Sequence, residues 1–209
     1  MSERKEVVLL TGASGSMGFE TFKLLWEKRD RYDIVLFLRP SRKNKKRFRK
    51  YEREITEGTG VRIVWGDALN RDDVVEACRG IDWCLHHMAL ISPAADRNPE
   101  MAEKVNARGT RYLVEAIEEQ DPEHIRLVNV GTVAEYGSRL APIHVARTGD
   151  PVIPSVYDHY AISKIRGELT VMQSLIKHRV SFRQTFIMIP NLFSLMDPIM
   201  FHQPINSFM

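Results

Sequence analysis

Three side chains in the second half of the sequence have the chemistry of a proton-transfer site. Tyr160 and Lys164 stand four positions apart in a segment that reads as a helix, so we expect both on one helix face. A phenol, with an ordinary pKa of about 10, becomes a usable acid or base when a nearby ammonium stabilises its anion. Thr132 follows a predicted strand and can hydrogen-bond the same substrate oxygen. The trio predicts acid–base chemistry on a hydroxyl or carbonyl group.

A glycine-rich segment near the start of the chain predicts a phosphate site. It reads Thr-Gly-Ala-Ser-Gly-Ser-Met-Gly over residues 11–18, directly after an apolar run and before a helical pattern. Glycine permits a tight turn in which backbone N–H groups approach a pyrophosphate, and the helix N-terminus adds partial positive charge. The residues that we expect to bind a dinucleotide here are Gly12, Ser14, Gly15, Met17 and Gly18.

The end of the second predicted strand bears on which dinucleotide is bound. Such sites usually carry an acid about 20 residues after the glycine motif, which accepts from the ribose hydroxyls. This chain has Arg39 there, followed by further basic residues and no acid. A guanidinium can bind a ribose 2′-phosphate with two hydrogen bonds, so Arg39 favours NADP(H) over NAD(H). The alternative is a solvated helix face, and we assign residues 45–50 to it.

Two further strand ends carry polar residues. Asp67, after the third strand, can accept from an adenine amino group or can cap a turn. His86 and His87 end the fourth strand, but no third ligand is near them in sequence, and we expect no metal.

Strand-like and helical patterns alternate along the chain, which positions all of these residues after strands. The predicted strands are 7–11, 33–38, 61–65, 81–86, 125–130 and 180–189. The predicted helices are 17–28, a basic helix ending near 57, 71–78, 99–119 and 157–177. This alternation is typical of an α/β fold with a doubly wound parallel sheet, in which ligands bind at the carboxyl ends of the strands.

Composition excludes several other classes. The 209 residues carry 30 Lys and Arg against 27 Asp and Glu, but eight of the basic residues fall in residues 39–50, and the remainder is mildly acidic. A general nucleic-acid binder is therefore not expected, and the basic segment has few aromatic residues for base stacking. Two cysteines without metal or redox spacing, and no long apolar stretch, predict a cytoplasmic protein without a membrane span.

Several motifs together resemble the short-chain dehydrogenase/reductase superfamily, specifically its extended, epimerase/dehydratase-like branch. They are the glycine segment, Gly66-Asp67, His87-Met88-Ala89, Val105-Asn106-Ala107-Arg108-Gly109-Thr110, residues 129–137, and Tyr160 with Lys164. The resemblance runs from about residue 6 to residue 190. It implies an NAD(P)-binding Rossmann domain over residues 1–190 and a remnant of a substrate-binding lobe over residues 191–209.

The resemblance also implies roles for single residues. Asp67 and Ala68 would contact adenine, and Met88 and Ala89 would line the cofactor cleft. Tyr160 would be the catalytic acid or base, with Thr132 orienting the substrate. Lys164 would bind the nicotinamide ribose and lower the Tyr160 pKa.

Three departures from the family pattern affect these expectations. Gly131 stands where many relatives have Ser, residues 183–190 match the family stretch only loosely, and extended members continue beyond a point equivalent to Met209. We therefore expect the C-terminal lobe to be missing or vestigial. The chain would then be either truncated or completed by a partner.

The leading hypothesis is an NADP-dependent oxidoreductase or epimerase/dehydratase-type enzyme acting on a small-molecule substrate. The alternative is a catalytically incomplete dinucleotide-binding sensor or regulatory module. Association of copies of the chain through helices is common in the resembled family, and the sequence leaves the oligomeric state open.

Overall fold

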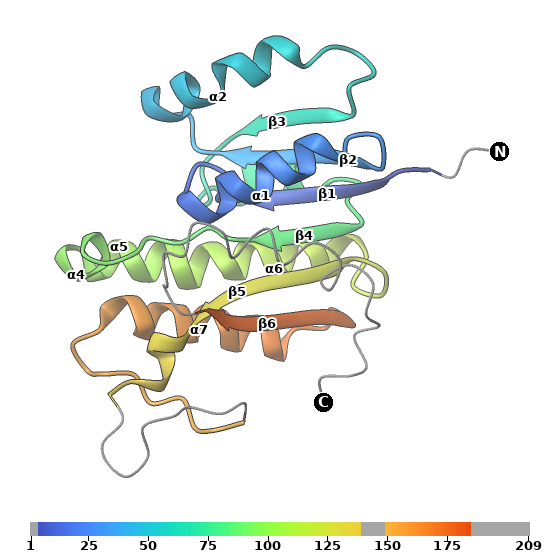
Figure 1. Cartoon of the computed structure of the whole chain (residues 1–209). Coiled ribbons are helices and arrows are strands. Elements are labelled where there is room, and N and C mark those ends of the chain that lie inside the picture. The colour runs from blue at the N-terminus through green and yellow to red at the C-terminus, as the bar shows by residue number, and fades with distance from the viewer. Residues whose placement is uncertain (1–3, 139–148, 185–209) are drawn as a thin grey trace.

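The computed structural model describes residues 4–138 and 149–184. Within them, six strands form one sheet, in the order β3-β2-β1-β4-β5-β6. The strands are β1 (Glu6–Thr11), β2 (Tyr32–Leu38), β3 (Val61–Trp65), β4 (Trp83–His86), β5 (Arg126–Thr132) and β6 (His178–Gln184). All neighbours pair in parallel, so the predicted doubly wound parallel sheet is confirmed. All six arrows in Figure 1 point to the same side.

The helices connect these strands. They are α1 (Ser16–Glu27), α2 (Arg42–Glu54), α3 (Arg71–Cys78), α4 (Ala94–Arg97), α5 (Pro99–Ala102), α6 (Gly109–Gln120) and α7 (His159–Gln173). A π-helical segment, η1 (Glu103–Arg108), joins α5 to α6, and a 3₁₀ turn, η2 (Val133–Tyr136), follows β5. The predicted helix over 99–119 is thus one helical run with a π-helical middle.

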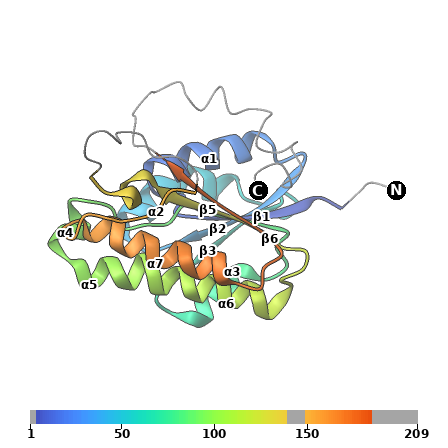
Figure 2. The same cartoon turned by 90° about the horizontal axis from the view of Figure 1, so that it is seen from below.

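Two apolar clusters hold the helices on opposite faces of the sheet. On one face, α1 and α2 bury Phe22 and Phe48 against the strands, with several aromatic rings in contact. On the other face, α3, α6 and α7 pack over strand residues such as Leu9 and Leu127. Figure 2 shows the two helix layers on either side of the sheet. Each fully buried side chain of this size stabilises the fold by about 1.5–3 kcal/mol, so both layers are firmly attached.

Local signals explain where the helices begin. Ser41 and Asn70 accept hydrogen bonds from the first turns of α2 and α3, and Asp158 does the same for α7 from the Ala161 N–H at 2.8 Å. The α7 helix is therefore shorter than predicted, because it begins after its Asp158 cap and ends at Gln173. The α2 helix ends at Glu54 rather than near 57.

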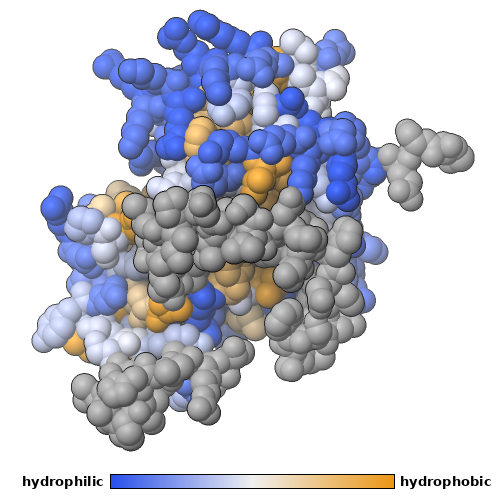
Figure 3. All heavy atoms as spheres, viewed as in Figure 1, coloured by the Kyte–Doolittle hydropathy of each residue, from blue (hydrophilic) through white to orange (hydrophobic). Residues whose placement is uncertain are grey.

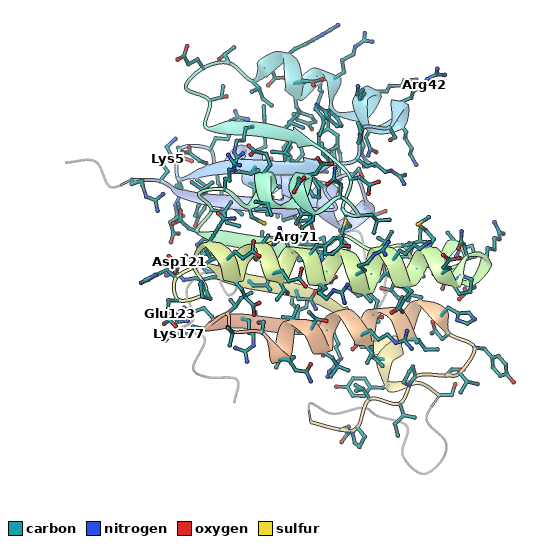
Figure 4. All side chains as sticks on the ribbon, turned by 180° about the vertical axis from the view of Figure 1, so that it is seen from behind. Lys5, Arg42, Arg71, Asp121, Glu123 and Lys177 are labelled. Atoms are coloured by element: carbon teal, nitrogen blue, oxygen red, sulfur yellow. The ribbon has the colours of Figure 1, made fainter. Side chains whose placement is uncertain are left out.

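The two ends of the parallel strands lie on opposite sides of the molecule. Figure 4 shows Arg42, at the start of α2, on the opposite side from Asp121, Glu123 and Lys177, which lie where α6 and α7 end. The carboxyl ends of the strands face the Arg42 side, and the predicted site residues follow these ends. The predicted boundary at residue 190 and the segment 191–209 lie outside the described residues, so this division stays a prediction.

Candidate functional site

The glycine turn lies between β1 and α1, at the point where the strand order reverses. Gly12 has a φ of 72°, and a Cβ there would lie 2.6 Å from the Met88 backbone nitrogen. A Cβ on Gly18 would lie 2.2 Å from the Gly12 carbonyl oxygen. Both positions therefore exclude any side chain, because the obstacles are backbone atoms.

The first turn of α1 is arranged to accept an anion. The Gly15 N–H donates to the Gly12 carbonyl at 2.9 Å, which closes the turn. Gly15 is the N-cap residue, and no side chain caps this helix end. The N–H groups of the first turn and the helix dipole are thus directed at the turn that holds Ser14 and Met17.

A buried histidine joins the glycine turn to the next element. The Thr110 hydroxyl donates to the Asn106 carbonyl at 2.7 Å, so its oxygen accepts from His86 Nε2 at 2.9 Å. His86 Nδ1 is then an acceptor, bound by the Thr11 hydroxyl at 2.8 Å. The Thr11 oxygen in turn accepts the Met88 N–H at 3.3 Å. This ordered chain fixes the neutral tautomer of His86 and ties β1, β4 and α6 together.

The loop after β4, which contains Met88 and Ala89, is held by an amide side chain. Asn106 Oδ1 accepts the Leu90 N–H at 2.7 Å, and its Nδ2 donates to the Leu90 carbonyl and to Ser163 Oγ, both at 2.9 Å. Met88 and Ala89 are half-buried beside the glycine turn. Asn106 therefore links the cleft loop to α7, a role that periodicity alone does not reveal.

Arg39 is exposed just beyond β2, and its carbonyl accepts from Asn44 Nδ2 at 2.9 Å. The basic surface of α2 is hydrophilic in Figure 3. Within residues 45–50, for which we predicted a solvated face, Phe48 is buried and Arg47 is only half-exposed. Arg47 reaches back to the glycine turn, donates to the Ser14 carbonyl at 3.0 Å and stacks 3.9 Å from the centre of the Phe19 ring.

Asp67 and Ala68 follow β3. Asp67 Oδ1 accepts the Leu69 N–H at 2.9 Å, and the Asp67 N–H donates to Asp73 at 2.8 Å. Asp67 therefore caps its own turn, which is one of the two roles that we predicted for it; the other, adenine binding, stays a prediction. Its side chain is exposed at the carboxyl edge, and Ala68 is buried beneath it.

Thr132, Tyr160 and Lys164 come together at the ends of β5 and α7. Thr132 Oγ1 accepts the Ala134 N–H at 3.3 Å, and the Thr132 side chain lies close enough to Tyr160 to oppose the rise of the tyrosine pKa. Lys164 is buried one turn further along α7, and its Nζ donates to the Val130 carbonyl at 2.7 Å. The i, i+4 spacing thus places both α7 side chains against the end of β5.

Burial dominates the electrostatics of this trio. It raises the pKa of Tyr160, the Thr132 side chain opposes that shift, and the charges of Glu135 and Asp158 add to it. Burial also lowers the pKa of Lys164, against the opposing effect of Glu135 and Glu168. The expectation that Lys164 lowers the Tyr160 pKa is wrong for this structure, because the pKa is raised and the largest cause is the loss of water contact around the phenol.

Sequence reasoning missed a buried charged cluster behind the trio. Glu135 and Glu168 both pair with Arg183, at 3.0 Å in the case of Glu135 Oε2 and Arg183 Nε. The sequence offered little signal for it, because Glu135 stands outside the predicted helices and strands, Glu168 in a predicted helix and Arg183 in a predicted strand. Their mutual contact depends on the packing of α7 against β5 and β6.

The two histidines after β4 are not arranged as metal ligands. Burial lowers the pKa of His86 to about 3 and that of His87 to about 4, and the charge of Lys164 adds to both shifts. Within residues 4–138 and 149–184, no three His, Cys, Asp or Glu side chains gather as a metal site would require.

The family model of the NAD-dependent epimerase/dehydratase family matches residues 8–201. The chain belongs to this family. Solved structures agree in fold. An epimerase/dehydratase-type neighbour, the UDP-Glc/GlcNAc 4-epimerase of Campylobacter jejuni, has a TM-score of 0.69 and 18% identity, over 84% of this chain and 53% of that one.

Two further structures were solved with NAD. A short-chain dehydrogenase/reductase superfamily protein of Agrobacterium tumefaciens has a TM-score of 0.64 and 23% identity, over 85% of this chain and 48% of that one. The UDP-glucuronic acid 4-epimerase of Bacillus cereus has a TM-score of 0.63 and 21% identity, over 85% and 56%. This family member thus spans about half the length of the structures it matches. No helix in its described part is long and apolar enough to cross a membrane.

Proposed function

We propose that this protein binds a nicotinamide dinucleotide along the carboxyl edge of its sheet and that Tyr160 moves a proton to or from a substrate oxygen. One observation carries the proposal. The glycine turn, at the reversal of strand order, and the Thr132–Tyr160–Lys164 trio stand on the same edge of one parallel sheet. Ligands of doubly wound sheets bind at this edge.

The residues present fit such a cofactor. Gly12 and Gly18 leave no room for side chains, so backbone can approach a pyrophosphate, and the uncapped N-terminus of α1 offers N–H donors. The NAD-bound relatives support the same conclusion. When bound, the nicotinamide ring accepts or donates hydride.

The chain's own residues supply the proton chemistry. The Tyr160 hydroxyl donates to or accepts from the substrate oxygen, and Thr132 holds that oxygen by a second hydrogen bond. Lys164 lies one helical turn away on the same helix, and its proposed role is to bind the nicotinamide ribose.

A matched pair of variants tests the role of Tyr160. Tyr160→Phe should keep the affinity for the dinucleotide and lose turnover. The control is Tyr157→Phe, in the segment just before α7, which should change neither because Tyr157 is 83% exposed. Since several similar structures are nucleotide-sugar enzymes, UDP-sugars are the first substrates to test. Unchanged turnover in Tyr160→Phe contradicts the assignment, and binding without any turnover favours the sensor alternative.

We further propose that the phosphate-bearing cofactor NADP(H) is preferred. The support is local, because Arg39 is exposed at the end of β2, where no acid is present to bind ribose hydroxyls. The main alternative is a preference for NAD(H), because the two similar structures described above were solved with NAD.

A fluorescence titration with NADPH and NADH decides between them. Arg39→Ala should weaken NADPH binding by about tenfold, the loss of one charge-assisted contact, and leave NADH binding unchanged. Arg53→Ala, at the far end of α2, is the control. Equal wild-type affinity for both cofactors rules out the phosphate role.

A further inference from the structure

Two buried carboxyl groups lie behind the candidate active site and have no part in the chemistry proposed above. Glu135 comes from η2 and is 0% exposed, and Glu168 comes from α7 and is 6% exposed. Carboxylates are almost never buried to this degree without partners, because leaving water penalises the charged form. The hydrogen-bond and ion-pair partners of the two carboxyl groups therefore determine whether both can be ionised.

Glu135 is bound on both oxygens. Its Oε1 accepts the backbone N–H of Thr132 at 3.2 Å, which closes a capping box around η2. Its Oε2 accepts from Arg183 Nε at 3.0 Å. The Glu168 carboxyl group accepts from Nη2, the neighbouring nitrogen on the same edge of this guanidinium, so the two carboxyl groups lie side by side. Glu135 therefore touches the backbone of a catalytic candidate directly.

Glu168 is held by the neighbouring nitrogen of the same guanidinium and by a serine. Arg183 Nη2 donates to its Oε1, and the Ser181 hydroxyl donates to Oε2 at 2.9 Å. A Cβ on Gly131 would lie only 2.5 Å from Oε2. The missing side chain at Gly131 thus leaves the space that the Glu168 carboxyl group fills.

The two positively charged side chains near the pair, Arg183 and Lys164, also donate hydrogen bonds to other groups. Among the described residues, the charged and titratable groups near Glu135 are Tyr136 on η2, Tyr160, Lys164 and Glu168 on α7, and Arg183 on β6. Arg183 divides its donors among two carboxyl groups and the Tyr136 hydroxyl, and Lys164 donates to a backbone carbonyl. Two buried carboxyl groups that accept from adjacent nitrogens of one guanidinium repel each other when both are ionised, and a proton held between them removes that repulsion.

We infer that Glu135 and Glu168 hold one proton between them, and that Glu135 acts as a positioning residue which sets the charge beside Tyr160. This inference rests on the proposed function for its catalytic meaning. The proton keeps a negative charge away from the phenol and preserves the Thr132 contact. Burial, with the nearby Glu168, raises the pKa of Glu135 to about 7, which is consistent with a proton retained near neutrality.

Infrared spectroscopy of the intact chain tests for the proton directly. At about pH 6, we expect the C=O band of a protonated carboxyl group, shifted by exchange into D₂O and absent in both Glu135→Gln and Glu168→Gln. The control is Glu6→Gln, because Glu6 also pairs with an arginine, Arg126 at 2.8 Å, but its side chain is 44% exposed and no second carboxyl group shares that arginine among the described contacts. A wild type without the band, or a band that persists in both Gln variants, overturns the inference.

A second measurement tests the effect on Tyr160 without needing a substrate. The ultraviolet titration of the wild type minus that of Tyr160→Phe isolates the ionisation of Tyr160. In a Glu135→Gln background this difference titration should move to lower pH, because the amide cannot ionise, and in Glu6→Gln it should not move. An unmoved titration in Glu135→Gln overturns the positioning role. If Glu135→Gln does not fold, Glu168→Gln is used in the same way.

The two proposals fail separately. Absence of dinucleotide binding would refute the proposed function but would leave the carboxyl band and the Tyr160 titration unaffected. Dinucleotide binding with no carboxyl band would leave the proposed function intact and refute the shared proton.

Discussion

Mild acid should destabilise this protein through the buried, neutral His86. Its ring nitrogens are both engaged, by Thr11 and Thr110, and burial lowers its pKa from about 6.5 to about 3. The unfolded chain therefore binds a proton below about pH 6.5 that the folded chain refuses, so stability is full above that pH and falls as pH decreases towards 3.

The size of the effect at pH 5 is nearly independent of the folded pKa. As long as the folded pKa lies well below 5, the loss of unfolding free energy depends only on the pKa of His86 in the unfolded chain, about 6.5. The difference from pH 5 is about 1.5 pH units, and at about 1.36 kcal/mol for each unit the loss is about 2 kcal/mol. This is a large part of the about 5–15 kcal/mol that holds a typical domain together. His87, whose pKa is lowered to about 4, acts in the same direction.

Urea unfolding at pH 7 and pH 5 measures the loss. His86→Gln offers a donor and an acceptor without a titrating group, so its stability should fall by about 2 kcal/mol less than that of the wild type between the two pH values. Leu85→Ala, the buried neighbour on β4, is the control, since it should cost about 2–5 kcal/mol at both pH values. Parallel pH dependence in the wild type and His86→Gln would refute the reasoning.

Three further outcomes are expected. Gly18→Ala should weaken dinucleotide binding by more than about tenfold in a fluorescence titration, because its Cβ meets the backbone at 2.2 Å, whereas Gly15→Ala, at 3.3 Å, should have a smaller effect; similar losses would contradict the turn geometry. Asn106→Leu should lower the urea-derived stability by about 3 kcal/mol by leaving both backbone groups of one loop residue unpaired, and a loss below about 1 kcal/mol would argue against that role. Cys78, buried with a pKa raised to about 12, and the buried Cys84 should react with a thiol reagent only as fast as the protein opens, and rapid labelling in the native state would contradict their burial.

The sheet was predictable because its signals are local. The strand at Val61–Trp65 and the helix at Arg71–Cys78 match their predictions in full, the helix because Asn70 caps it. Apolar runs of this length are typical of parallel strands buried on both faces. The 3₁₀ turn at 133–136 and the short α4 helix were missed, since four residues carry too little periodicity to register.

The catalytic roles of Thr132, Tyr160 and Lys164 stay predictions. The glycine turn, and the placement of Tyr160 and Lys164 on one helix face, were predictable from sequence because their spacing has a direct geometric meaning. Contacts between distant segments were not. Arg47 reads as one of many surface cations, and only the packing of α2 against α1 shows that it reaches Ser14. Glu135 and Glu168 lie 33 positions apart, and their contact exists because α7 returns across β5. The residues from 185 onward lie outside the described part, so the end of the predicted last strand stays untested.

The π-helical segment Glu103–Arg108 makes the candidate site sensitive to chain length in an unusual way. A π turn holds one residue more than an α turn, so deleting a single residue there would restore a regular helix and still leave it intact. The parts of the helix on either side of the deletion would keep their relative orientation, because the wide turn is what accommodates the extra residue. A deletion in the regular part of α6 would instead rotate the parts on either side of it by about 100° relative to each other, because each residue advances an α-helix by that angle. Asn106 and Thr110, which anchor the β4 loop and His86, lie at or directly after this wide turn. The loss of one residue is therefore expected to be better tolerated within 103–108, provided that Asn106 remains, than elsewhere in this helix.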